Sequence, residues 1–534
     1  MVANLTILSF LFLSASTFID ATTTNATNPH AFIQCFLNST SSSNSTSKLL
    51  HIPSTTSYAD VFNSSIRNIR SITPNATMPA IILTPTNASH VQAAVKCGKA
   101  QGLRIRVRSG GHDYEGLSSV SSGDPFILLD LINFASVAVD ATDGTAWVGA
   151  GATIGELYYH INVGAKNQTA GFPASICHTV GVSGLLSGGG IGTMMRKYGT
   201  SADNIVDAVV VDASGTLLDR KSMGEDLFWA IRGGGASSFG IVLSFKINLV
   251  YVPPTVTVFQ VQKTLSEDVT KLVGRWQKVA PRLDDNLFIR VLVNAIGNKE
   301  KGNRTIQASF QSLFLGGRQE LLSILDKSFP ELGVEAKDCT EMSWMNSTLY
   351  FAKAPKLDPT FLLNRNPYSN SSFKAKSDFV KKPIPAEGLE KIWKFLLEAV
   401  DDSVQMVMDP LGARMDEIEE TAIPFPHRKG NLYNIQHYLG WPTNEDSQKH
   451  LDWMKSFYNF LAPYVSKSPR AAYLNYRDID LGRNEKGKTS YRKATEWGQR
   501  YFLNNFKRLA QVKAKVDPDN YFQHEQSIPP YSIN

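Results

Sequence analysis

The stretch GFPASICHTVGVSGLLSGGGIG, residues 171–192, is the part of the sequence around which the rest is organised. Its seven glycines remove Cβ atoms, as is needed where backbone approaches backbone or a ligand closely. A flexible linker would also be rich in glycine, but apolar residues such as Phe172, Val182 and Leu186 are interleaved here. We interpret the stretch as a backbone cradle for a large anionic ligand, with Cys177 beside it.

Length and composition favour a large globular protein. The chain has 534 residues, 43% of them hydrophobic, which is enough for a sizeable core and two or three domains. The formal net charge of +6 is small for this length, and no dense block of Lys and Arg occurs. These features argue against a nucleic-acid surface.

The N-terminus predicts entry into the secretory pathway. Residues 1–21 contain an apolar run over 5–13 followed by small residues, which is typical of a signal peptide cleaved near Ala21. The run is too short to span a membrane, and no later stretch is long and apolar enough. Ten N-x-S/T sequons agree with an extracellular (apoplast) or vacuolar glycoprotein. They begin at Asn25, Asn38, Asn44, Asn63, Asn75, Asn87, Asn167, Asn303, Asn346 and Asn370.

The four cysteines are too few for a disulfide scaffold. No CxxC or Cys/His spacing suggests zinc, so we expect no metal site. In an oxidising compartment Cys35 and Cys97 could pair and hold the N-terminus. Cys177 and Cys339 then need separate explanations.

The first half of the chain reads as an α/β unit followed by further strands. A short apolar strand, AIILTP, precedes a helix over 87–100 and the alternating strand LRIRVRSGG. Later segments predict a helix at 154–161, a hairpin with its turn at 213–215, a helix at 225–231 and a long strand, IVLSFKINLV.

The clearest boundary is YVPP, residues 251–254, because two prolines end a strand and stiffen a linker. Beyond it, segments such as NLFIRVLV alternate at strand period, and helical stretches at 265–280, 317–327 and 386–400 separate them. This pattern predicts an α+β domain, an antiparallel sheet covered by helices. The composition changes again at Tyr473, and a helical segment follows near 490–513.

The usual nucleotide and hydrolase motifs are absent: no strict G-x-G-x-x-G between strand and helix, no Walker sequence, no G-x-S-x-G and no HExxH. A second notable stretch is RSGGHDYEG, residues 108–116. Ser109, Gly110 and Gly111 could present successive N–H groups to a pyrophosphate as an anion nest. His112, next in the turn, would by itself suit a structural hydrogen-bonding role at least as well.

Several motifs together resemble the plant FAD-linked oxidoreductases of the berberine bridge enzyme-like family. They are RSGGHDYEG, FPASICHTVGVSG with SGGGIG, RKYG at 196–199, NLYNIQH at 431–437, NYRDIDLG at 475–482 and HEQSIPP near the end. The resemblance covers essentially all of the mature chain, in the family's order. It implies a vanillyl-alcohol-oxidase (PCMH-type) FAD domain built from residues 22–253 and 473–534, with a substrate domain, 254–472, inserted.

The resemblance also implies how FAD is held. His112 matches the histidine that bonds the flavin 8α-methyl carbon, and Cys177 matches the cysteine that bonds ring carbon C6. Cys35 and Cys97 match the family's disulfide, which leaves Cys339 as a buried free thiol. The other residues expected to contact the cofactor are Arg108, Ser109, Gly110, Gly111, Asp113, Val180, Gly181, Gly184, Gly188, Gly189, Gly192, Val242 and Tyr476.

Four polar residues, Tyr114, Tyr198, Gln436 and Tyr476, match the family's substrate side. Oxidation of an alcohol or phenol needs a base, and a tyrosine is a poor one at its ordinary pKa of ~10 unless a donor or cation stabilises the phenolate. We expect Tyr476 to be the base and Gln436 to orient it. Tyr114 and Tyr198 would shape the pocket, with Tyr198 or the basic residues before it as the stabilising group.

Further residues bear on the substrate and the electron acceptor. Arg290, Trp441 and Arg414 are candidates for the substrate wall. Val180 matches the family's oxygen-gating position, where a small residue is associated with oxidases, although valine would serve plain packing equally well.

The chain also departs from the family pattern. Leu185 stands where His is common, and His178, where Pro is usual, adds a titratable group beside the thioether. Leu411 and Ala413 replace a common Tyr and Gly. These departures put the ordinary substrate in doubt more than the cofactor.

The sequence therefore predicts a monomeric, bicovalently flavinylated oxidase that acts on a phenolic, alcohol or alkaloid-like metabolite. Hydride would pass to flavin N5 and on to O2, giving H2O2, in some cases with ring closure. Three alternatives stay open: a redox-neutral cyclase of Diels–Alder type, a carbohydrate oxidase, and a glycoprotein that binds a partner without catalysis.

Overall fold

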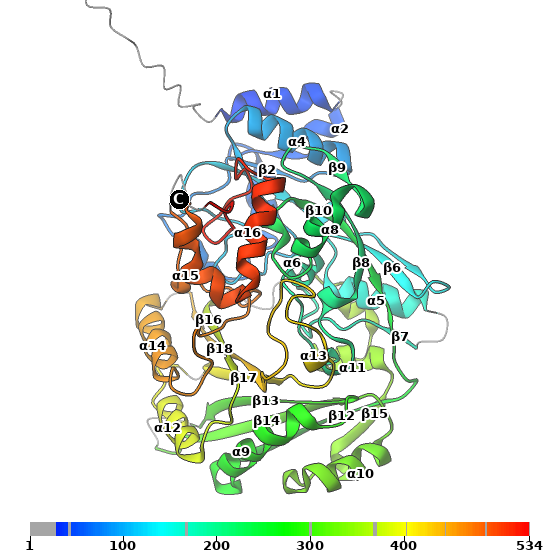
Figure 1. The fold of residues 1–534 in the computed structure, drawn as a ribbon, viewed down its shortest axis with the longest axis vertical. Coiled ribbons are helices and arrows are strands. Elements are labelled where there is room, and N and C mark those ends of the chain that lie inside the picture. The colour runs from blue at the N-terminus through cyan, green and yellow to red at the C-terminus, as the bar shows by residue number, and fades with distance from the viewer. Residues whose placement is uncertain are drawn as a thin grey trace, which may run out of the picture.

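The computed structural model describes residues 28–40, 44–165, 169–297, 302–366, 371–401, 403–443, 445–485 and 489–532. The predicted signal peptide and the sequons at Asn25, Asn167 and Asn370 lie outside these ranges. Two sheets and both chain ends form the upper part of the molecule as drawn in Figure 1, and a large antiparallel sheet forms the lower part.

The first sheet contains the predicted strand–helix–strand unit. Its order is β1-β2-β4-β3, and β4 runs parallel to both β2 and β3. Asn87 caps the helix between them by accepting a hydrogen bond from the His90 N–H. The elements are α1 (Pro29–Ser39), α2 (Asn44–Ser47), β1 (Leu50–His51), α3 (Thr56–Asn63), β2 (Ile81–Leu83), α4 (Ala88–Ala100), β3 (Arg104–Arg108) and β4 (Phe126–Asp130).

A disulfide between Cys35 and Cys97 joins α1 to α4, which confirms the pairing that the family resemblance implies. Cys177 and Cys339 are free, and Cys339 is buried as expected.

The second sheet is antiparallel, with the order β5-β6-β10-β8-β9. The glycine-rich stretch lies between its strands in sequence and contains a short helix, α6, which the sequence did not predict. The elements are β5 (Val137–Asp140), β6 (Thr145–Gly149), α5 (Ile154–Gly164), β7 (Ala170–Gly171), α6 (Val182–Ser187), α7 (Met195–Tyr198), β8 (Ile205–Val211), β9 (Leu217–Leu218), α8 (Arg220–Ile231), β10 (Ile241–Asn248) and β11 (Val250–Tyr251).

The C-terminal helices complete this upper part. Helices α15 (Tyr491–Phe502) and α16 (Asn505–Val516), red in Figure 1, lie beside the N-terminal elements, and α16 contacts α8. Trp497 and Leu509 from these helices share one buried cluster with Phe32 of α1. Segments from the two ends of the chain thus form a single core.

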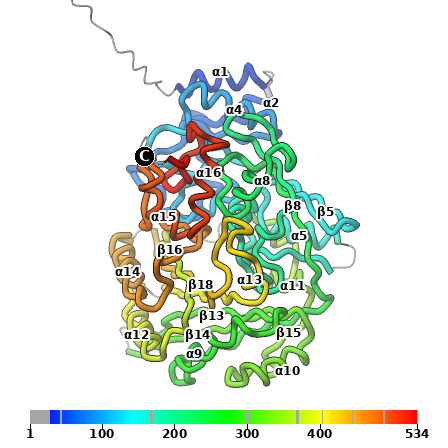
Figure 2. Tube along the Cα trace, in the orientation of Figure 1, coloured from blue at the N-terminus to red at the C-terminus, as the bar shows by residue number. Residues whose placement is uncertain are grey.

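The lower sheet has seven strands in the order β15-β12-β14-β13-β17-β18-β16, and every neighbouring pair is antiparallel. Figure 2 follows the chain through it and back to the upper part. The elements are β12 (Val256–Thr264), α9 (Val269–Val279), β13 (Leu287–Ile296), β14 (Thr305–Phe314), α10 (Arg318–Ser328), β15 (Cys339–Met342), α11 (Trp344–Phe351), β16 (Ser371–Val380), α12 (Ala386–Leu397), β17 (Gln405–Pro410), α13 (Arg414–Glu417), β18 (Tyr433–Pro442) and α14 (Ser447–Phe460).

The two faces of this sheet have different neighbours. Helices α9, α10, α12 and α14 contribute to one buried cluster with alternate strand residues, including Ile289, Val291 and Val293 of β13. Because side chains alternate along a strand, Arg290 points to the opposite face, toward the upper part. The predicted α+β class, with an antiparallel sheet covered by helices, is confirmed.

The upper buried cluster takes in residues from both parts. Trp344 and Leu349 of α11, and Leu411, Met415 and Phe425 of the segment after β17, belong to the upper cluster, although they fall in the predicted range 254–472. The domain limits therefore remain a prediction. Among the described residues, no helix combines the length and the apolar character that a membrane crossing requires.

Candidate active site

A cavity of about 380 Å³ lies where the upper part meets the lower sheet, on the face that carries Arg290. Its wall combines the turn after β3, the glycine-rich stretch, strands β13 and β18, and residues 473–477. Ligand sites in proteins occupy about 300–1,000 Å³ and collect in such junctions.

His112 and Cys177 lie together on one wall of this cavity. His112 Nε2 is 2.9 Å from the Thr179 hydroxyl oxygen, and Cys177 Sγ is 3.6 Å from that same oxygen. Burial, together with the nearby Arg67 guanidinium, lowers the pKa of His112 to about 3. The imidazole is therefore neutral at physiological pH and keeps a lone pair for bonding.

The glycine cradle forms the floor. The backbones of Gly110 and Gly181 pack so closely that a Cβ on Gly110 would lie 2.3 Å from the Gly181 nitrogen. A Cβ on Gly184, on helix α6, would meet nothing within 4 Å, so this side of the helix is open. The N–H groups of Gly110 and Gly111 have no hydrogen-bond acceptor within the described ranges. Asp113 shapes the turn by accepting from the Glu115 and Leu117 N–H groups.

The cavity wall also carries a hydrogen-bonded aromatic group. Gln436 Nε2 donates to the Tyr114 hydroxyl at 2.6 Å. The ring of Tyr114 stacks on that of Tyr476, with centroids 5.7 Å apart and planes 9° apart. Tyr473 meets the Tyr476 ring edge-on at 5.0 Å. Strand β18 and the C-terminal segment thus bring Gln436 and Tyr476 into one group, with Tyr114 between them.

Arg290 and Asp409 form a buried ion pair behind Tyr476. Arg290 Nε lies 3.1 Å from Asp409 Oδ1, and the side chains are 8% and 9% exposed. The strands pair so that Val291 faces Met408, which makes Arg290 and Asp409 neighbours on β13 and β17. Burial raises the pKa of Tyr476 well above its ordinary value, Asp409 raises it further, and Arg290 opposes both.

Most of the predicted site residues line the cavity. They are Ser109, Gly110, Gly111, His112, Asp113, Tyr114, Cys177, Val180, Gly181, Gly184, Gly188, Val242, Arg290, Gln436 and Tyr476, together with the divergent Leu185.

Three predicted cofactor contacts lie elsewhere. Arg108 is fully buried, pairs with Asp130 and donates to the carbonyls of Val61 and Phe62, so it anchors β3 beneath the cavity wall. Gly189 and Gly192 pack against other parts of the protein. A Cβ on Gly189 would lie 2.9 Å from the Phe425 ring, and a Cβ on Gly192 would lie 1.9 Å from the Ala174 carbonyl oxygen.

The structure also corrects three residues assigned to the substrate side. The Tyr198 hydroxyl donates to the Tyr251 carbonyl, where the chain leaves the upper part, and the residue does not line the cavity. Trp441 is buried and stacks on His450, with centroids 4.7 Å apart. Arg414 is exposed and pairs with Glu417.

The expected stabilising cations beside Tyr198 are also engaged elsewhere. Arg196 is buried and donates to the carbonyls of Leu283 and Leu411, and Lys197 donates to Asn286. His178 packs its ring on Phe361 and does not line the cavity, so it adds no titratable group beside Cys177.

Several residues that line the cavity or contact its lining residues were not predicted from the sequence. Thr179 bridges His112 and Cys177, although it stands inside the stretch that the sequence singled out. No sequence motif marks Asp409, because its ion pair with Arg290 arises only when β17 pairs with β13. Ser118 and Arg477 line the cavity with a buried hydroxyl and a buried guanidinium nitrogen that lack hydrogen-bond partners.

Comparison with known proteins identifies the family. Residues 79–220 match the family model for an FAD binding domain, and residues 472–529 match the model described as berberine and berberine like. Over 479 residues the chain is 51% identical to berberine bridge enzyme-like 26 of Arabidopsis thaliana, which covers 89% of this chain and 88% of that protein. The chain belongs to the berberine bridge enzyme-like family.

Other relatives of this berberine bridge enzyme-like protein have named activities. It is 49% identical to tetrahydroberberine oxidase of Berberis wilsoniae over 481 residues, 90% of each chain. Wild-type Phl p 4.0202, described as a glucose dehydrogenase, matches with a TM-score of 0.88 at 44% identity, over 94% of this chain and 99% of that chain. An isoleucine-to-valine variant of Phl p 4, described as a glucose oxidase, matches equally well: TM-score 0.88, 44% identity, 94% and 99%.

The protein is therefore an FAD-linked oxidoreductase, and the cavity residues fit FAD. The free N–H groups of Gly110 and Gly111 and the unpartnered Arg477 nitrogen suit the anionic pyrophosphate. The open side of α6 at Gly184 gives room for a close approach of the cofactor. His112 and Cys177 supply two nucleophilic atoms on one wall.

Proposed function

We propose that this protein is a secreted oxidase that holds FAD through two covalent bonds and oxidises a small phenolic, alcohol or alkaloid-like molecule. The observation that carries the proposal is the convergence of two sets of residues on one cavity. His112 and Cys177 lie together, and Tyr114, Gln436, Tyr476 and Arg290 line the same cavity.

His112 and Cys177 would tether the flavin ring, through the 8α-methyl carbon and ring carbon C6. The neutral imidazole of His112 can act as a nucleophile, and the Thr179 hydroxyl holds both side chains in position. Two bonds from neighbouring side chains would hold the flavin ring in the cavity more firmly than one.

FAD, when bound, supplies the acceptor for the hydride that leaves the substrate. Tyr476 would take the proton from the substrate hydroxyl at its own phenolic oxygen. Burial raises the pKa of this phenol, so the phenolate requires a nearby positive charge, and Arg290 lowers the pKa. Gln436 holds Tyr114 against the Tyr476 ring and so fixes the geometry of this wall.

Molecular oxygen is the proposed final electron acceptor. Val180 lines the cavity three residues after Cys177, at the position that matches the family's oxygen gate. The isoleucine-to-valine variant of Phl p 4 is described as an oxidase, whereas the unaltered protein is described as a dehydrogenase. A valine is therefore compatible with access of O2 to the flavin.

Covalent tethering is tested by denaturing the purified protein and measuring the flavin that separates from it. Cys177→Ala should keep its flavin through His112, His112→Ala through Cys177, and the double variant should release all of it. Release of the whole flavin from the wild-type protein would contradict the proposal. Ser175→Ala, next to the site but carrying no tether, is the matched control.

Substrate oxidation is tested with a panel of phenols, benzylic and allylic alcohols and alkaloids. A true substrate should bleach the oxidised flavin spectrum without oxygen, and with oxygen should consume O2 and form H2O2 in equal amounts. Conversion of a substrate with unbleached flavin and no O2 uptake would support the redox-neutral cyclase in its place.

A carbohydrate oxidase is the second candidate, because Phl p 4 is described as a glucose dehydrogenase. The same assay with mono- and oligosaccharides distinguishes the two. Peroxide release from sugars at a higher kcat/KM than from any aromatic alcohol would favour the carbohydrate oxidase.

Secretion is supported by the disulfide and by the position of several sequons. Asn38, Asn63, Asn75, Asn87 and Asn303 are exposed, so each is accessible to a glycan. A fall in mass on treatment with a peptide N-glycosidase is expected for protein from a plant host, and a mass unchanged by the enzyme would contradict this part.

A further inference from the structure

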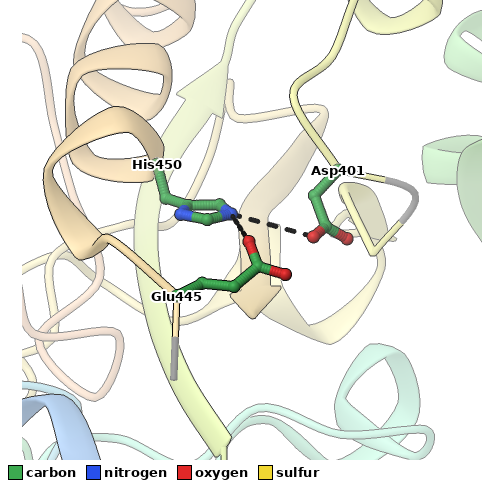
Figure 3. A group of neighbouring side chains, drawn as sticks. All are labelled: Asp401, Glu445 and His450. Atoms are coloured by element: carbon green, nitrogen blue, oxygen red, sulfur yellow. Dashed lines mark ion pairs between the residues drawn. The ribbon is translucent and has the colours of Figure 1, made fainter. Parts of the chain in front are cut away.

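Asp401, Glu445 and His450 come together at one end of strands β17 and β18 of the lower sheet, outside the wall of the flavin cavity (Figure 3). Asp401 lies in the turn between α12 and β17. Glu445 lies between β18 and α14, and His450 lies in the first turns of α14. We propose that these three side chains form a binding site for a divalent transition-metal cation, with Zn²⁺ as the best match.

The His450 ring is oriented as a ligand. Its side chain is fully buried, and Nδ1 is 2.9 Å from the Asp446 carbonyl oxygen, which can only accept. Nδ1 therefore carries the hydrogen, and Nε2 is the atom that points at the two carboxylates. That nitrogen is buried and has no hydrogen-bond partner. Metal-bound histidines commonly donate the other ring N–H to a backbone carbonyl in this way.

The distances suit an ion between the three groups better than direct hydrogen bonds. His450 Nε2 is 3.5 Å from Glu445 Oε2 and 3.7 Å from Asp401 Oδ2. Hydrogen bonds from nitrogen to oxygen measure about 2.7–3.2 Å. Tetrahedral Zn²⁺ with bonds of about 2.0–2.2 Å holds its ligand atoms roughly 3.3–3.6 Å apart. The three possible ligand atoms all lie within 4.8 Å of one another.

Neighbouring groups hold the ligands in this arrangement. The Ser403 N–H donates to Asp401 Oδ1 at 2.8 Å, which leaves Oδ2 directed at His450. The indole of Trp441 lies flat on the His450 ring, with planes 8° apart, and its N–H donates to Ser447. Trp441 thus supports His450 and does not belong to the substrate wall.

The local charges also favour a cation. Two carboxylates face one ring nitrogen, and a divalent ion would neutralise both. The nearest competitor is Lys449, whose ammonium lies 2.8 Å from Glu445 Oε2. Its side chain is 50% exposed, so it can turn away into solvent when a cation binds.

The donor set indicates the class of metal. Ca²⁺ and Mg²⁺ prefer oxygen ligands throughout, whereas one imidazole with two carboxylates suits Zn²⁺. Asp401 and Glu445 are 23% and 35% exposed, so solvent can supply a fourth ligand. A bound ion would tie the turn before β17 to the start of α14, at the end of β18, the strand that carries Gln436.

Cysteine and histidine spacing could not reveal this set, which has no cysteine and a single histidine. The proposal therefore departs from the expectation that the chain binds no metal, which rested on that spacing.

The test uses the full-length flavin-containing protein, dialysed against EDTA and then titrated with ZnCl2 by calorimetry. We expect one Zn²⁺ per chain and a rise in the midpoint of thermal unfolding that MgCl2 does not produce. Asp401→Asn and Glu445→Gln should each weaken binding by more than the roughly 10–100-fold that loss of an outer-shell partner costs. His450→Gln should abolish it.

Two further variants sharpen the test. Lys449→Met should strengthen Zn²⁺ binding by about 2–5-fold, because it frees Glu445 from an exposed ion pair. Glu387→Gln is the matched control, since Glu387 also pairs with a lysine four residues on but has no histidine beside it. It should bind Zn²⁺ as the wild type does.

Absence of stoichiometric Zn²⁺ binding to the wild-type protein would overturn the proposal. So would unchanged binding in both Asp401→Asn and Glu445→Gln. Because His450 is buried and its replacement could prevent folding, these two partly exposed residues keep the proposal open to refutation.

Discussion

At the scale of single residues, the environment of Tyr476 decides whether it can act as a base. Burial and the Asp409 carboxylate raise the pKa of its phenol, and Arg290 lowers it. Burial also raises the pKa of Asp409, which Arg290 partly offsets. The pKa of Tyr476 therefore depends on both neighbours, and Asp409 limits how far Arg290 can stabilise the phenolate.

Asp409→Asn should lower the pKa of Tyr476, because it removes a negative charge that opposes phenolate formation. The rise of kcat/KM with pH should then move to lower pH, by roughly one unit. The profile is measured with the substrate that O2 uptake identifies.

Arg290→Gln is the opposing variant and should shift the same profile to higher pH. Profiles that move in the same direction in both variants, or in neither, would contradict the electrostatic role of the pair.

The residue scale also shows what local motifs can locate. His112, Cys177, Tyr114, Gln436 and Tyr476 each stand in a short motif that can be recognised without the fold, and all five line the cavity, while their roles stay predictions. Local motifs could not reveal Asp409, because a strand pairing supplies its partner. They also misplaced Tyr198, whose hydroxyl is taken by the Tyr251 carbonyl.

At the scale of elements, β16 is the strand that is hardest to predict from the sequence. Its residues, SSFKAKSDFV, are buried almost throughout but include Lys374, Lys376 and Asp378. Buried charges interrupt the apolar alternation that predicts β13 from the segment NLFIRVLV. They are tolerated because Lys374 pairs with Glu115 at 2.5 Å and with Asp478 at 2.8 Å.

This ion cluster joins three distant parts of the chain. Burial alone would lower the pKa of the Lys374 ammonium, but Asp478 and Glu115 raise it. Burial would likewise raise the pKa of Glu115, but Lys374 and Arg70 lower it. Each charge is thus stable in the core only because of the others.

Lys374→Met should destabilise the protein by about 3 kcal/mol, the lower end of the cost of removing one partner of a buried pair, since Arg70 and Lys376 remain. The midpoint of unfolding in urea measures the change. Lys391→Met, which removes an exposed lysine paired with Glu387, is the control and should leave the midpoint unaltered.

The pH dependence of that difference gives a second check. A carboxyl with a lowered pKa stabilises the fold above its ordinary pKa, 4.5 for Glu115, and loses this contribution as the pH falls further. The difference in urea unfolding midpoint between wild type and Lys374→Met should therefore become smaller below pH 4.5. A difference that grows as the pH falls would contradict the stabilising role of the ionised Glu115.

At the scale of the whole molecule, the upper and lower parts are joined by segments that belong to both. The sequence predicts the two parts well, because the α/β unit and the antiparallel strands each have a local periodicity. It does not predict that residues 344–349 and 411–425 pack into the upper core. The two prolines at 253–254 indicate where one part ends, but they carry no information about the path of later loops.

His427 lies in one of these returning segments and contacts both parts. Its ring stacks on Phe379 of β16 at 3.8 Å, and Nε2 lies 3.1 Å from the Tyr501 carbonyl of α15, so Nε2 carries the hydrogen and donates. Burial lowers the pKa of His427 to about 3, so the ring stays neutral in the fold.

His427→Gln should make the stability of the protein less sensitive to acid. In the unfolded chain this histidine takes up a proton near its ordinary pKa of 6.5, whereas in the fold it does so near 3. Between these values only the unfolded state gains the proton, so the folded state loses up to about 1.4 kcal/mol per pH unit as the pH falls. The glutamine amide can still donate to Tyr501 but does not titrate.

The unfolding midpoint of the variant should therefore fall less steeply between pH 6.5 and 4. Above pH 7 both proteins should respond to pH alike, and an equal slope at acid pH would show that His427 is not the group responsible.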